Sequence, residues 1–177
     1  MKVLGLVLAG GASSRMGEDK ALVQLAGESL VARAVRRLSP QVDRVILSAK
    51  HNYDLDIDYV RDEQNGQGPV SGILAGLEYA RAQGFASLLS VAVDTPFFPD
   101  DLGQQLAPGQ YVARHYTCAH WKTEFEAQIA KAFIAGERRL APILALCNMQ
   151  AIDLPEEGFF NVNDAQDLAM AQARLLS

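Results

Sequence analysis

A short apolar segment near the start of the chain, residues 2–8, ends abruptly in two glycines. Valine and leucine dominate the segment, and its length suits a strand that is buried on both faces. Fully buried strands of this kind are typical of parallel sheets, because helices cover both faces of such a sheet. The segment therefore predicts an α/β fold in which the first strand runs directly into a tight loop.

The rest of the first hundred residues alternates between strand-like and helix-like segments. Ser29 can cap the first helix, and Pro40 can close it. This alternation predicts a three-layer α/β/α sandwich with a mostly parallel, Rossmann-like sheet. Because no repeat or linker interrupts the chain, we expect a single domain over residues 1–177. The expected strands are 2–8, 44–48, 57–60, 86–93 and 150–154, and the expected helices are 29–38, 70–82, 122–135, 140–147 and 165–176, with a further helix entered at 99–102.

The composition limits the classes of protein to which the chain can belong. It has 177 residues, of which 49% are hydrophobic and 21% charged, and its net charge is −5. A negative net charge argues against general nucleic-acid binding, which depends on a basic surface. Two cysteines, Cys118 and Cys147, are too few for a disulfide framework, so we expect buried, reduced thiols. No apolar run reaches the ~20 residues of a membrane span, so we expect a cytoplasmic protein without membrane contact.

The loop after the first strand, LAGGASSRMGEDK over residues 8–20, has the composition of a phosphate-binding site. Ligands of open α/β sheets bind at the carboxyl ends of the strands, where this loop should lie. Glycines let successive backbone N–H groups approach phosphate oxygens, and arginine and lysine add positive charge. The loop contains Gly10, Gly11, Gly17, Arg15 and Lys20. The alternative is a glycine-rich strand-to-helix turn with solvated charges.

Two familiar phosphate-binding motifs are excluded by the order of residues in this loop. A P-loop requires Gly-Lys-Ser/Thr, whereas Gly17 is followed by Glu-Asp-Lys. The dinucleotide fingerprint requires G-x-G-x-x-G and an acidic residue at the end of the second strand, which here ends at Ser48. A nicotinamide-dependent enzyme is therefore not expected.

The loop, together with four later blocks in the same order, resembles the molybdenum cofactor guanylyltransferases of the nucleotidyltransferase superfamily. The signature of the superfamily is LAGGxSxRMGxDK, and the matching blocks extend over nearly the whole chain. The first block is shared with sibling enzymes that use other sugars or bases, whereas its combination with the last block favours the molybdopterin branch. The later blocks are GPVSG (68–72), DTPF (94–97), GERR (136–139) and FFNVN (159–163).

The resemblance implies that the protein transfers GMP from GTP to the terminal phosphate of molybdopterin or of the molybdenum cofactor, with release of pyrophosphate. Because the attacking phosphate is already ionised, no general base is required, and the enzyme positions the substrates and neutralises charge. The resemblance makes Lys20, Arg15 and Asp94 the catalytic residues, with Mg²⁺ bound to Asp94. The nucleotide-binding positions that it implies are Leu8, Ala9, Gly10, Gly11, Lys20, Ser48, Asp62 and Asp94.

Asp94 is also a candidate magnesium ligand from its position in the sequence. It follows the apolar run at 86–93 and precedes Thr95 and Pro96, so it should project from the carboxyl edge of the sheet. A carboxylate among phosphates suits Mg²⁺, which prefers one or two protein oxygens together with phosphate oxygens and water. The alternative is that Asp94 caps the next turn through Thr95.

Asn161 and Asn163 alternate along an extended stretch, so their side chains should face the same way. Their amides could supply a neutral oxygen to a metal or bind the pterin of the acceptor. Alternatively, Asn163 or Asp164 caps the last helix. Arg138, in the turn at 136–139, could meet the phosphate of the second substrate.

Several positions differ from the family or have ordinary explanations. Ser48 stands where the family often has Asn, although a serine can still hydrogen-bond to a nucleotide. Asp62 follows an expected strand and, by resemblance, contacts the base or ribose; alternatively it is a solvated loop acid. Residues 114–133 depart most from the family, which usually has a His-Pro pair where this chain has His120-Trp121. In the family this segment would help to hold the molybdopterin.

Other functions and partners are open alternatives. A sibling transferase could use CTP or a different phosphorylated acceptor, and a non-catalytic module could bind GTP without transferring it. Cys118 and His120 form a weak zinc motif, which a partly buried strand or turn explains better. By resemblance, the partners are the two substrates and, transiently, proteins that deliver the cofactor. We expect a monomer without a nucleic-acid partner.

Overall fold

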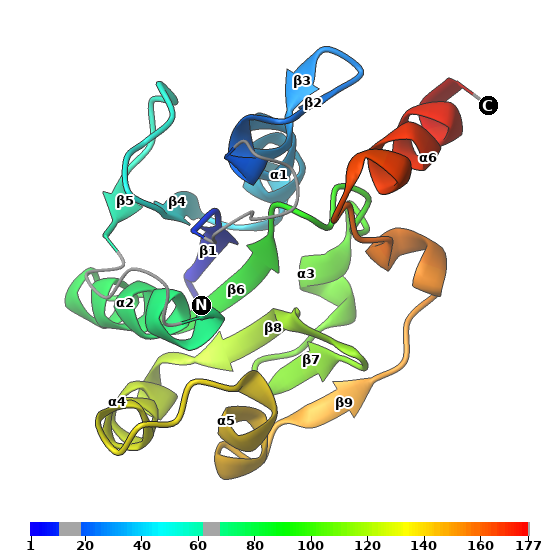
Figure 1. Cartoon of the computed structure of the whole chain (residues 1–177). Coiled ribbons are helices and arrows are strands. Elements are labelled where there is room, and N and C mark those ends of the chain that lie inside the picture. Colours follow the sequence, from blue (N-terminus) through cyan, green and yellow to red (C-terminus); the bar gives the residue numbers. More distant parts are fainter. Residues whose placement is uncertain (11–18, 62–67, 177) are drawn as a thin grey trace.

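A seven-stranded sheet forms the middle layer of the protein (Figure 1). The computed structural model describes residues 1–10, 19–61 and 68–176. The strands of the sheet are β1 (Val3–Leu8), β4 (Arg44–Ser48), β5 (Tyr59–Val60), β6 (Ser87–Ala92), β7 (Gln110–Val112), β8 (His115–Lys122) and β9 (Gln150–Ile152). Their order is β5-β4-β1-β6-β8-β7-β9, and among these strands β8 alone runs antiparallel to its neighbours. Two further strands, β2 (Gln24–Leu25) and β3 (Glu28–Ser29), pair separately.

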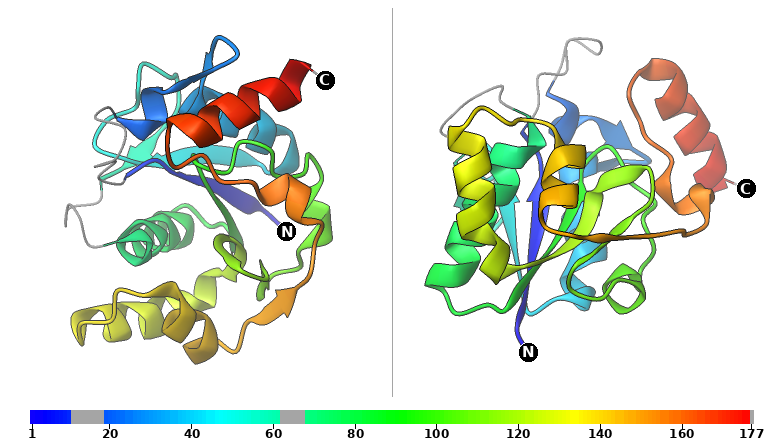
Figure 2. Two further views of the ribbon diagram at one scale, coloured as in Figure 1. Left: turned by 45° about the vertical axis from the view of Figure 1, so that its right-hand side comes forward. Right: turned by 90° about the horizontal axis from the view of Figure 1, so that it is seen from below.

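Helices cover both faces of the sheet, which gives the three layers visible in Figure 1 and Figure 2. One face is covered by α1 (Leu30–Leu38), α3 (Leu102–Gln105) and α6 (Ala165–Leu176), and the other by α2 (Pro69–Ala82), α4 (Glu126–Ile134) and α5 (Leu140–Leu146). The 3-10 turns are η1 (Lys20–Leu22), η2 (Ser39–Gln41), η3 (Thr123–Phe125) and η4 (Glu156–Phe159). The predicted α/β/α architecture with a mostly parallel sheet is confirmed. Within the described residues, no helix combines the length and apolarity needed to cross a bilayer.

The helices begin and end close to their sequence signals. Ser29 Oγ accepts the N–H of Ala32 at 3.3 Å as the cap of α1, and Pro40 lies in the turn that follows this helix. Gly84 follows α2 with a left-handed φ of +75°, as expected for a helix stop. The helix expected at 122–135 begins later, because Lys122 is the last residue of β8 and a 3-10 turn precedes α4.

The strands β2, β3 and β7 and most of β8 were not predicted from the sequence. The turn between β2 and β3 places both Ala26 (φ +53°) and Gly27 (φ +83°) in the left-handed region, as a two-residue hairpin turn requires. Alanine seldom adopts this conformation, and two-residue strands are too short for a periodic pattern. The pairing of β7 with β8 is irregular after Tyr111, which interrupts the alternation of β8.

The register of three parallel strands brings their carboxyl ends to one level. Leu8 at the end of β1 is paired with Ser48 of β4 on one side and with Ala92 of β6 on the other. Backbone bonds continue this alignment beyond the strands. The N–H of Ala9 donates to Ser48 O at 3.0 Å, and the N–H of Val93 donates to Leu8 O at 3.2 Å. The segments that follow β1, β4 and β6 therefore leave the sheet side by side at one edge.

Helix α2 approaches the sheet closely because its inner face carries two glycines. A Cβ on Gly76 would lie 2.8 Å from Leu6 Cδ2. A Cβ on Gly72 would lie 2.5 Å from Ser48 Oγ and 2.9 Å from Leu8 Cδ2. These distances are shorter than van der Waals contact, so larger side chains would push the helix away from the sheet. Gly72 therefore lets the start of α2 pack directly against the carboxyl ends of β1 and β4.

His120, the histidine of the weak zinc motif, is buried and hydrogen-bonded within the fold. His120 is 4% exposed, with Nδ1 2.7 Å from Leu106 O and Nε2 2.9 Å from Ser87 Oγ. A carbonyl oxygen only accepts, so Nδ1 donates to Leu106 and Nε2 accepts from the Ser87 hydroxyl. Both ring nitrogens are occupied, and Cys118 and Cys147 are buried free thiols. Of the partly buried strand or turn expected at 118–120, the structure shows the strand, and its residues there are buried. The expected reduced, buried cysteines are confirmed.

Two arginines of α1 hold the segment that follows β6. Arg33 is 8% exposed, and its Nε donates to the carbonyl oxygen of Pro96 at 2.9 Å. Arg37 donates to the carbonyl oxygen of Phe98. The guanidinium of Arg33 also lies 5.3 Å from the centre of the Phe97 ring. Helix α1 therefore fixes the backbone at the end of the central strand by bonds to main-chain oxygens.

Replacing Arg33 by methionine should lower the free energy of unfolding by about 2 kcal/mol, because a buried hydrogen bond from a charged group would be lost. The matched control is Arg36→Met on the same helix, whose side chain is 58% exposed and hydrogen-bonds twice to Glu28. An exposed pair of this kind contributes about 1 kcal/mol or less. Urea denaturation of both variants measures the difference, and equal losses would contradict the role of Arg33.

Lowering the pH below 6.5 should destabilise the fold through His120. Burial lowers the pKa of this histidine from its ordinary value of 6.5, so the folded protein resists protonation while the unfolded chain takes up a proton. The contribution is fully present above pH 6.5 and is lost as the pH falls toward the lower folded pKa. The slope reaches at most about 1.4 kcal/mol per pH unit.

Urea denaturation of the wild type and of His120→Gln across this pH range tests the assignment. Glutamine does not titrate, so the variant should be less stable at neutral pH but should lose less stability on acidification. The same dependence on pH in both proteins would exclude His120 as its cause.

Candidate functional site

Side chains from three distant parts of the sequence meet at the carboxyl edge of the sheet. Lys20 lies in η1, Asp94 follows β6, and Asn163 precedes α6. Lys20 Nζ is 3.3 Å from Asp94 Oδ2 and donates to Asn163 Oδ1 at 3.0 Å. The side chains of Lys20 and Asp94 remain 19% and 29% exposed, so a ligand can reach them. We call these three residues the Lys20 cluster.

The backbone of Lys20 is held by its short 3-10 turn. Asp19 caps this turn, because its Oδ1 accepts the N–H of Ala21 at 3.1 Å. The carbonyl oxygen of Asp19 also accepts the N–H of Leu22 at 2.9 Å. Ala21 is fully buried in the core, whereas the side chain of Lys20 extends toward Asp94. The cap and the buried alanine thus fix the point from which the ammonium group extends.

Asp94 is held through both its backbone and its side chain. Its carbonyl oxygen accepts the N–H of Val162 at 2.8 Å, which joins the end of β6 to the segment before α6. Thr95 Oγ1 donates to Asn161 Oδ1 at 3.0 Å and lies 3.4 Å from Asp94 Oδ1. The carboxylate therefore faces both the Lys20 ammonium and the Thr95 hydroxyl. The carboxylate thus lies at the carboxyl edge, as expected, and its contact with Thr95 is between the two side chains, while the N–H of Thr95 donates to Ala92 O.

The two asparagines reach the same side of the segment, as their spacing predicts. Val162 between them is fully buried, whereas Asn161 and Asn163 are exposed and bond to Thr95 and Lys20. Helix α6 is capped by Asp164, whose Oδ1 accepts the N–H of Asp167 at 2.9 Å. Of the two alternatives for the cap, Asp164 is thus the one that the structure supports. The side chain of Asn163 belongs to the Lys20 cluster.

The start of the glycine-rich loop follows directly from β1. Leu8 and Ala9 are buried, at 7% and 5% exposed, so a ligand can meet only their backbone. Gly10 is exposed, and a Cβ there would come no closer than 3.8 Å to Ser48 O. Ser48 is 2% exposed with its hydroxyl against Gly72, so a contact between that hydroxyl and a nucleotide stays a prediction. The predicted residues Gly11, Arg15 and Asp62 lie outside the described residues.

Arg138 lies in the turn between α4 and α5. Its guanidinium is 3.7 Å from the centre of the Phe133 ring, and it donates to the carbonyl oxygens of Phe133 and Glu137. A Cβ on Gly68, the residue before α2, would lie 3.3 Å from the carbonyl oxygen of Arg138. The turn is therefore close to the start of α2, and the described contacts do not join Arg138 to the Lys20 cluster.

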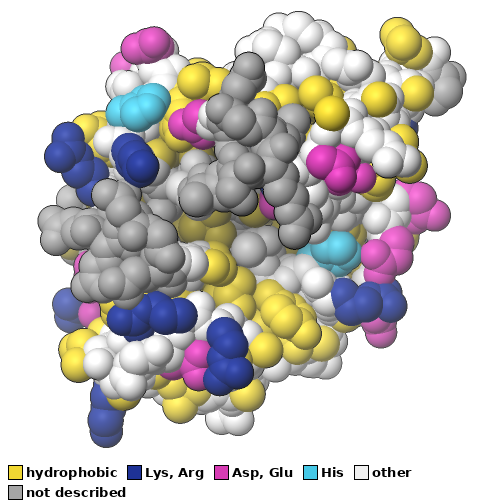
Figure 3. Space-filling view, in the orientation of Figure 1, with side chains coloured by type: hydrophobic (Ala, Val, Ile, Leu, Met, Phe, Trp, Pro, Cys, Tyr) yellow, Lys and Arg dark blue, Asp and Glu magenta, His cyan; other side chains and the backbone are white. Residues whose placement is uncertain are grey.

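The surface near the cluster is hollowed and sparsely charged. In Figure 3 a hollow lies near the centre of the face, and its floor is mostly yellow and white, that is, hydrophobic side chains together with backbone and other side chains outside the charged classes. In the same orientation β1 and β6 end near this hollow (Figure 1). Arg114, directly before β8, forms an ion pair with Glu156 of η4, and His115 Nε2 lies 3.1 Å from the same carboxylate. The Lys20 cluster itself supplies one ammonium and one carboxylate.

The donor set of the cluster suits a weakly held divalent cation. Among the described residues, no group of three or more His, Cys, Asp or Glu side chains is placed to hold a metal. A single carboxylate, Asp94, stands near the amide oxygens of Asn161 and Asn163. This set fits Mg²⁺, which takes most of its ligands from phosphates and water. It does not fit a structural zinc site, which requires four nitrogen or sulfur ligands.

Sequence reasoning missed two residues that shape the cluster. In the sequence Asp19 is only a member of the loop, but its carboxylate caps the turn that carries Lys20. Thr95 indicates a turn after Asp94, but its hydroxyl also joins Asn161 to the end of β6. The position of Asp19 directly before Lys20, at the start of a turn, is a capping signal that could have revealed the first. No local pattern could have revealed the second, because its partner is distant in the sequence.

Comparison with known proteins identifies the family. The MobA-like NTP transferase domain matches residues 5–154. A protein of Rhodobacter capsulatus named molybdenum cofactor guanylyltransferase is 39% identical, over 99% of this chain and 97% of its own length. A protein of the same name from Cereibacter sphaeroides is 37% identical, over 99% of this chain and 98% of its own length.

Solved structures share the same fold. Molybdopterin-guanine dinucleotide biosynthesis protein A from Archaeoglobus fulgidus superposes with a TM-score of 0.78 at 21% identity, covering 98% of each chain. A 2-C-methyl-D-erythritol 4-phosphate cytidylyltransferase from Thermus thermophilus superposes with a TM-score of 0.71 at 16% identity, covering all of both chains. The similarity to these solved structures shows the fold. The family match and the full-length relatives show the family. The chain therefore belongs to the MobA-like NTP transferase family.

Proposed function

We propose that the protein is a molybdenum cofactor guanylyltransferase, which transfers GMP from GTP to the terminal phosphate of molybdopterin and releases pyrophosphate. The relatives that match over nearly their full length carry this name. The observation that carries the proposal is the Lys20 cluster at the carboxyl edge, where open α/β sheets bind their ligands. It combines a cation for the triphosphate, a carboxylate for a divalent ion and an amide for the acceptor side.

In the proposed reaction, an oxygen of the acceptor phosphate forms a bond to the α-phosphorus of GTP. The bond from that phosphorus to the bridging oxygen breaks, and pyrophosphate leaves with the electron pair. The acceptor oxygen is already ionised, so no residue has to remove a proton. Lys20 would place its ammonium group against the phosphate oxygens, where negative charge is concentrated, and the backbone N–H groups after β1 would hold the triphosphate.

Asp94 would hold the Mg²⁺ ion, with the amide oxygens of Asn161 and Asn163 as neutral neighbours. When bound, Mg²⁺ would neutralise phosphate charge without any proton transfer. Thr95 and Val162 hold the carboxylate and its backbone in place before any ligand arrives, so little reorganisation is needed at that point.

The remaining site residues are part of the same proposal. Arg15 and the amide of Gly11 would bind phosphates, and Asp62 would contact the base or ribose. Arg138 would meet the acceptor phosphate from the turn that lies next to the start of α2. A transient contact with proteins that deliver the cofactor, and a monomeric state, are proposed with the function.

Lys20→Ala and Asp94→Ala should each lower the rate of pyrophosphate release by about 100-fold or more, since each removes charge that acts on the reacting phosphates. Both variants should fold, because the side chains are partly exposed and lie outside the core. The measurement is pyrophosphate release from GTP and Mg²⁺ with molybdopterin supplied, alongside thermal unfolding.

Lys122→Ala is the matched control, because Lys122 forms an exposed pair with Glu124 at 3.6 Å. This pair lies at the other edge of the sheet, where Lys122 is in register with Ser87 at the start of β6. The control should keep the wild-type rate. Wild-type rates in either Lys20→Ala or Asp94→Ala would contradict the roles assigned to these residues.

GTP should raise the unfolding temperature more than CTP, UTP or ATP when each is added with Mg²⁺. A ligand at about 100 times its dissociation constant stabilises the folded state by about 2.7 kcal/mol, which a thermal shift readily detects. A larger shift with CTP would instead identify a cytidylyltransferase. A GTP-dependent shift without pyrophosphate release in the presence of molybdopterin would identify a binding module that does not transfer the nucleotide.

A further inference from the structure

A tyrosine hydroxyl joins the two ends of the glycine-rich loop. Tyr53 Oη donates to Asp19 Oδ2 at 2.9 Å and lies 3.4 Å from the carbonyl oxygen of Ala9. Ala9 lies near the start of the loop of residues 8–20, and Asp19 lies near its end, directly before Lys20. The same side chain therefore contacts the chain on entry to the loop and on exit from it.

The two carboxylate oxygens of Asp19 accept hydrogen bonds from two different parts of the chain. Its Oδ1 accepts the N–H of Ala21 and so caps the turn that carries Lys20, while its Oδ2 accepts the bond from Tyr53. A carboxylate with both oxygens bonded cannot rotate without breaking one of these bonds. Tyr53 therefore restrains the cap itself, and through the cap the backbone of Lys20.

The turn that presents Tyr53 is built from strained backbone. Tyr53 and Asp54 have left-handed φ values of +54° and +58°, which side chains other than glycine adopt only at a cost of about 1 kcal/mol or more each. Local bonds stabilise this conformation. The N–H of Tyr53 donates to His51 Nδ1, and the N–H of Asp54 donates to Asn52 Oδ1, both at 3.2 Å. Strain maintained by dedicated side chains is typical of a conformation that serves a purpose.

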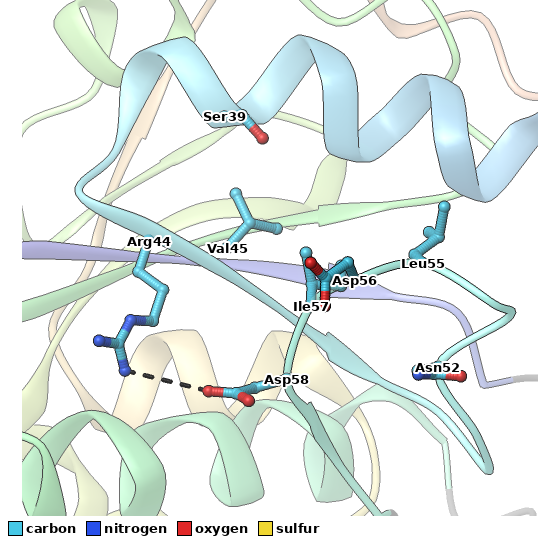
Figure 4. A pocket seen from close by; sticks show the side chains of 8 residues that line it. All are labelled: Ser39, Arg44, Val45, Asn52, Leu55, Asp56, Ile57 and Asp58. Atoms are coloured by element: carbon cyan, nitrogen blue, oxygen red, sulfur yellow. Dashed lines mark ion pairs between the residues drawn. The ribbon is translucent and has the colours of Figure 1, made fainter.

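The same turn is anchored to the core on its other side. Tyr53, Leu55 and Ile57 pack partly buried against the cluster of apolar side chains beneath α1. Figure 4 shows Leu55 directed toward that helix, with Asn52 at the turn before it. The N–H of Leu55 donates to Asn52 O at 3.0 Å. These contacts hold the turn after β4 against the core, and so they fix the position of the Tyr53 hydroxyl.

The hydroxyl of Tyr53 stays protonated and can therefore always donate its hydrogen bond. Burial, followed by the bond to Asp19, raises the pKa of Tyr53 well above its ordinary value. The hydroxyl therefore keeps its proton throughout the physiological range. A bond from this donor to a carboxylate is charge-assisted, and such bonds are stronger than those between neutral groups.

We propose that Tyr53 is a positioning residue, which restrains the Asp19 cap and thereby holds Lys20 at the reacting phosphates. The inference rests on the proposed function, because it assigns Lys20 to the triphosphate. Tyr53 acts through Asp19 and touches no reacting atom. Without its hydroxyl, the carboxylate of Asp19 is held through Oδ1 only, so the cap of the Lys20 turn is less restrained and the ammonium is less often placed beside Asp94 and Asn163.

The test is Tyr53→Phe, which removes the hydroxyl and keeps the ring. Tyr79→Phe is the matched control, because Tyr79 also donates to an aspartate, Asp58, at 2.7 Å, and neither residue belongs to the Lys20 cluster. Tyr53→Phe should lower kcat/KM for GTP about tenfold, in keeping with a hydrogen bond to a charged group. Most of this decrease should come from a lower kcat, with little change in KM. Tyr79→Phe should have the wild-type values.

A double-mutant experiment with Lys20 shows whether Tyr53 acts by positioning Lys20 or only by stabilising the fold. In a Lys20→Ala background, Tyr53→Phe should reduce the rate by less than twofold, since there is no ammonium left to place. A tenfold loss in that background, or equal losses for Tyr53→Phe and Tyr79→Phe, would overturn the proposal.

Hydrogen exchange of the backbone amides of Ala21 and Leu22 provides a readout that needs no turnover. Both amides are bonded to Asp19, so Tyr53→Phe should accelerate their exchange several-fold, while Tyr79→Phe should not. Unchanged exchange would overturn the proposal about Tyr53 even in an active enzyme. Accelerated exchange in a protein that releases no pyrophosphate would support the restraint on the Lys20 turn and would overturn the proposed function alone.

Discussion

The ion pair between Lys20 and Asp94 depends on the alignment of neighbouring parallel strands. Leu8 of β1 is paired with Ala92 of β6, so the chain segments that follow these strands start at the same height. A shift of this register by one residue would turn buried side chains toward the opposite face of the sheet, so the buried faces fix the register. The other parts of the site are built around this alignment. The segment before α6 adds Asn163, arginines of α1 hold the backbone after Asp94, and Tyr53 holds the cap before Lys20.

The partial exposure of the pair matters as much as its geometry. A fully buried ion pair would resist separation, because each charge would be left without a partner in a medium of low dielectric constant. Lys20 and Asp94 are 19% and 29% exposed, and Lys20 also bonds to a neutral amide. The ammonium can therefore leave its present partners at small cost, as the proposed binding of phosphate oxygens requires. The carboxylate released in that exchange would be free for a divalent ion.

The sequence predicted the parts of the fold that depend on local pattern. Apolar runs indicated β1, β4 and β6, and Ser29 and Gly84 marked ends of α1 and α2. The short strands β2, β3 and β7 were not predicted, whereas β5 and β9, which are as short, lie within the expected strands 57–60 and 150–154. Such short strands depend on pairing with their neighbours, which the sequence does not show directly. In the site, the carboxyl-end rule predicted that the first loop and Asp94 lie at the same edge of the sheet, where Lys20 and Asp94 meet. The bond from Lys20 to Asn163 was not predicted, since no local pattern relates residues so far apart. The hydrogen bond from Tyr53 to Asp19 depends on the left-handed backbone of the turn at Tyr53 and Asp54, which composition does not reveal.

The separation of the cluster residues along the chain has a consequence for how the protein acquires its site. Lys20 bonds to one partner 74 residues away and to another 143 residues away. Contacts of such long range close large loops and form late in folding. During synthesis, β1, α1, β4, α2 and β6 can assemble before the segment with Asn163 has left the ribosome. The segments that carry Lys20 and Asp94 can therefore come together in a nascent chain before the amide of Asn163 joins them.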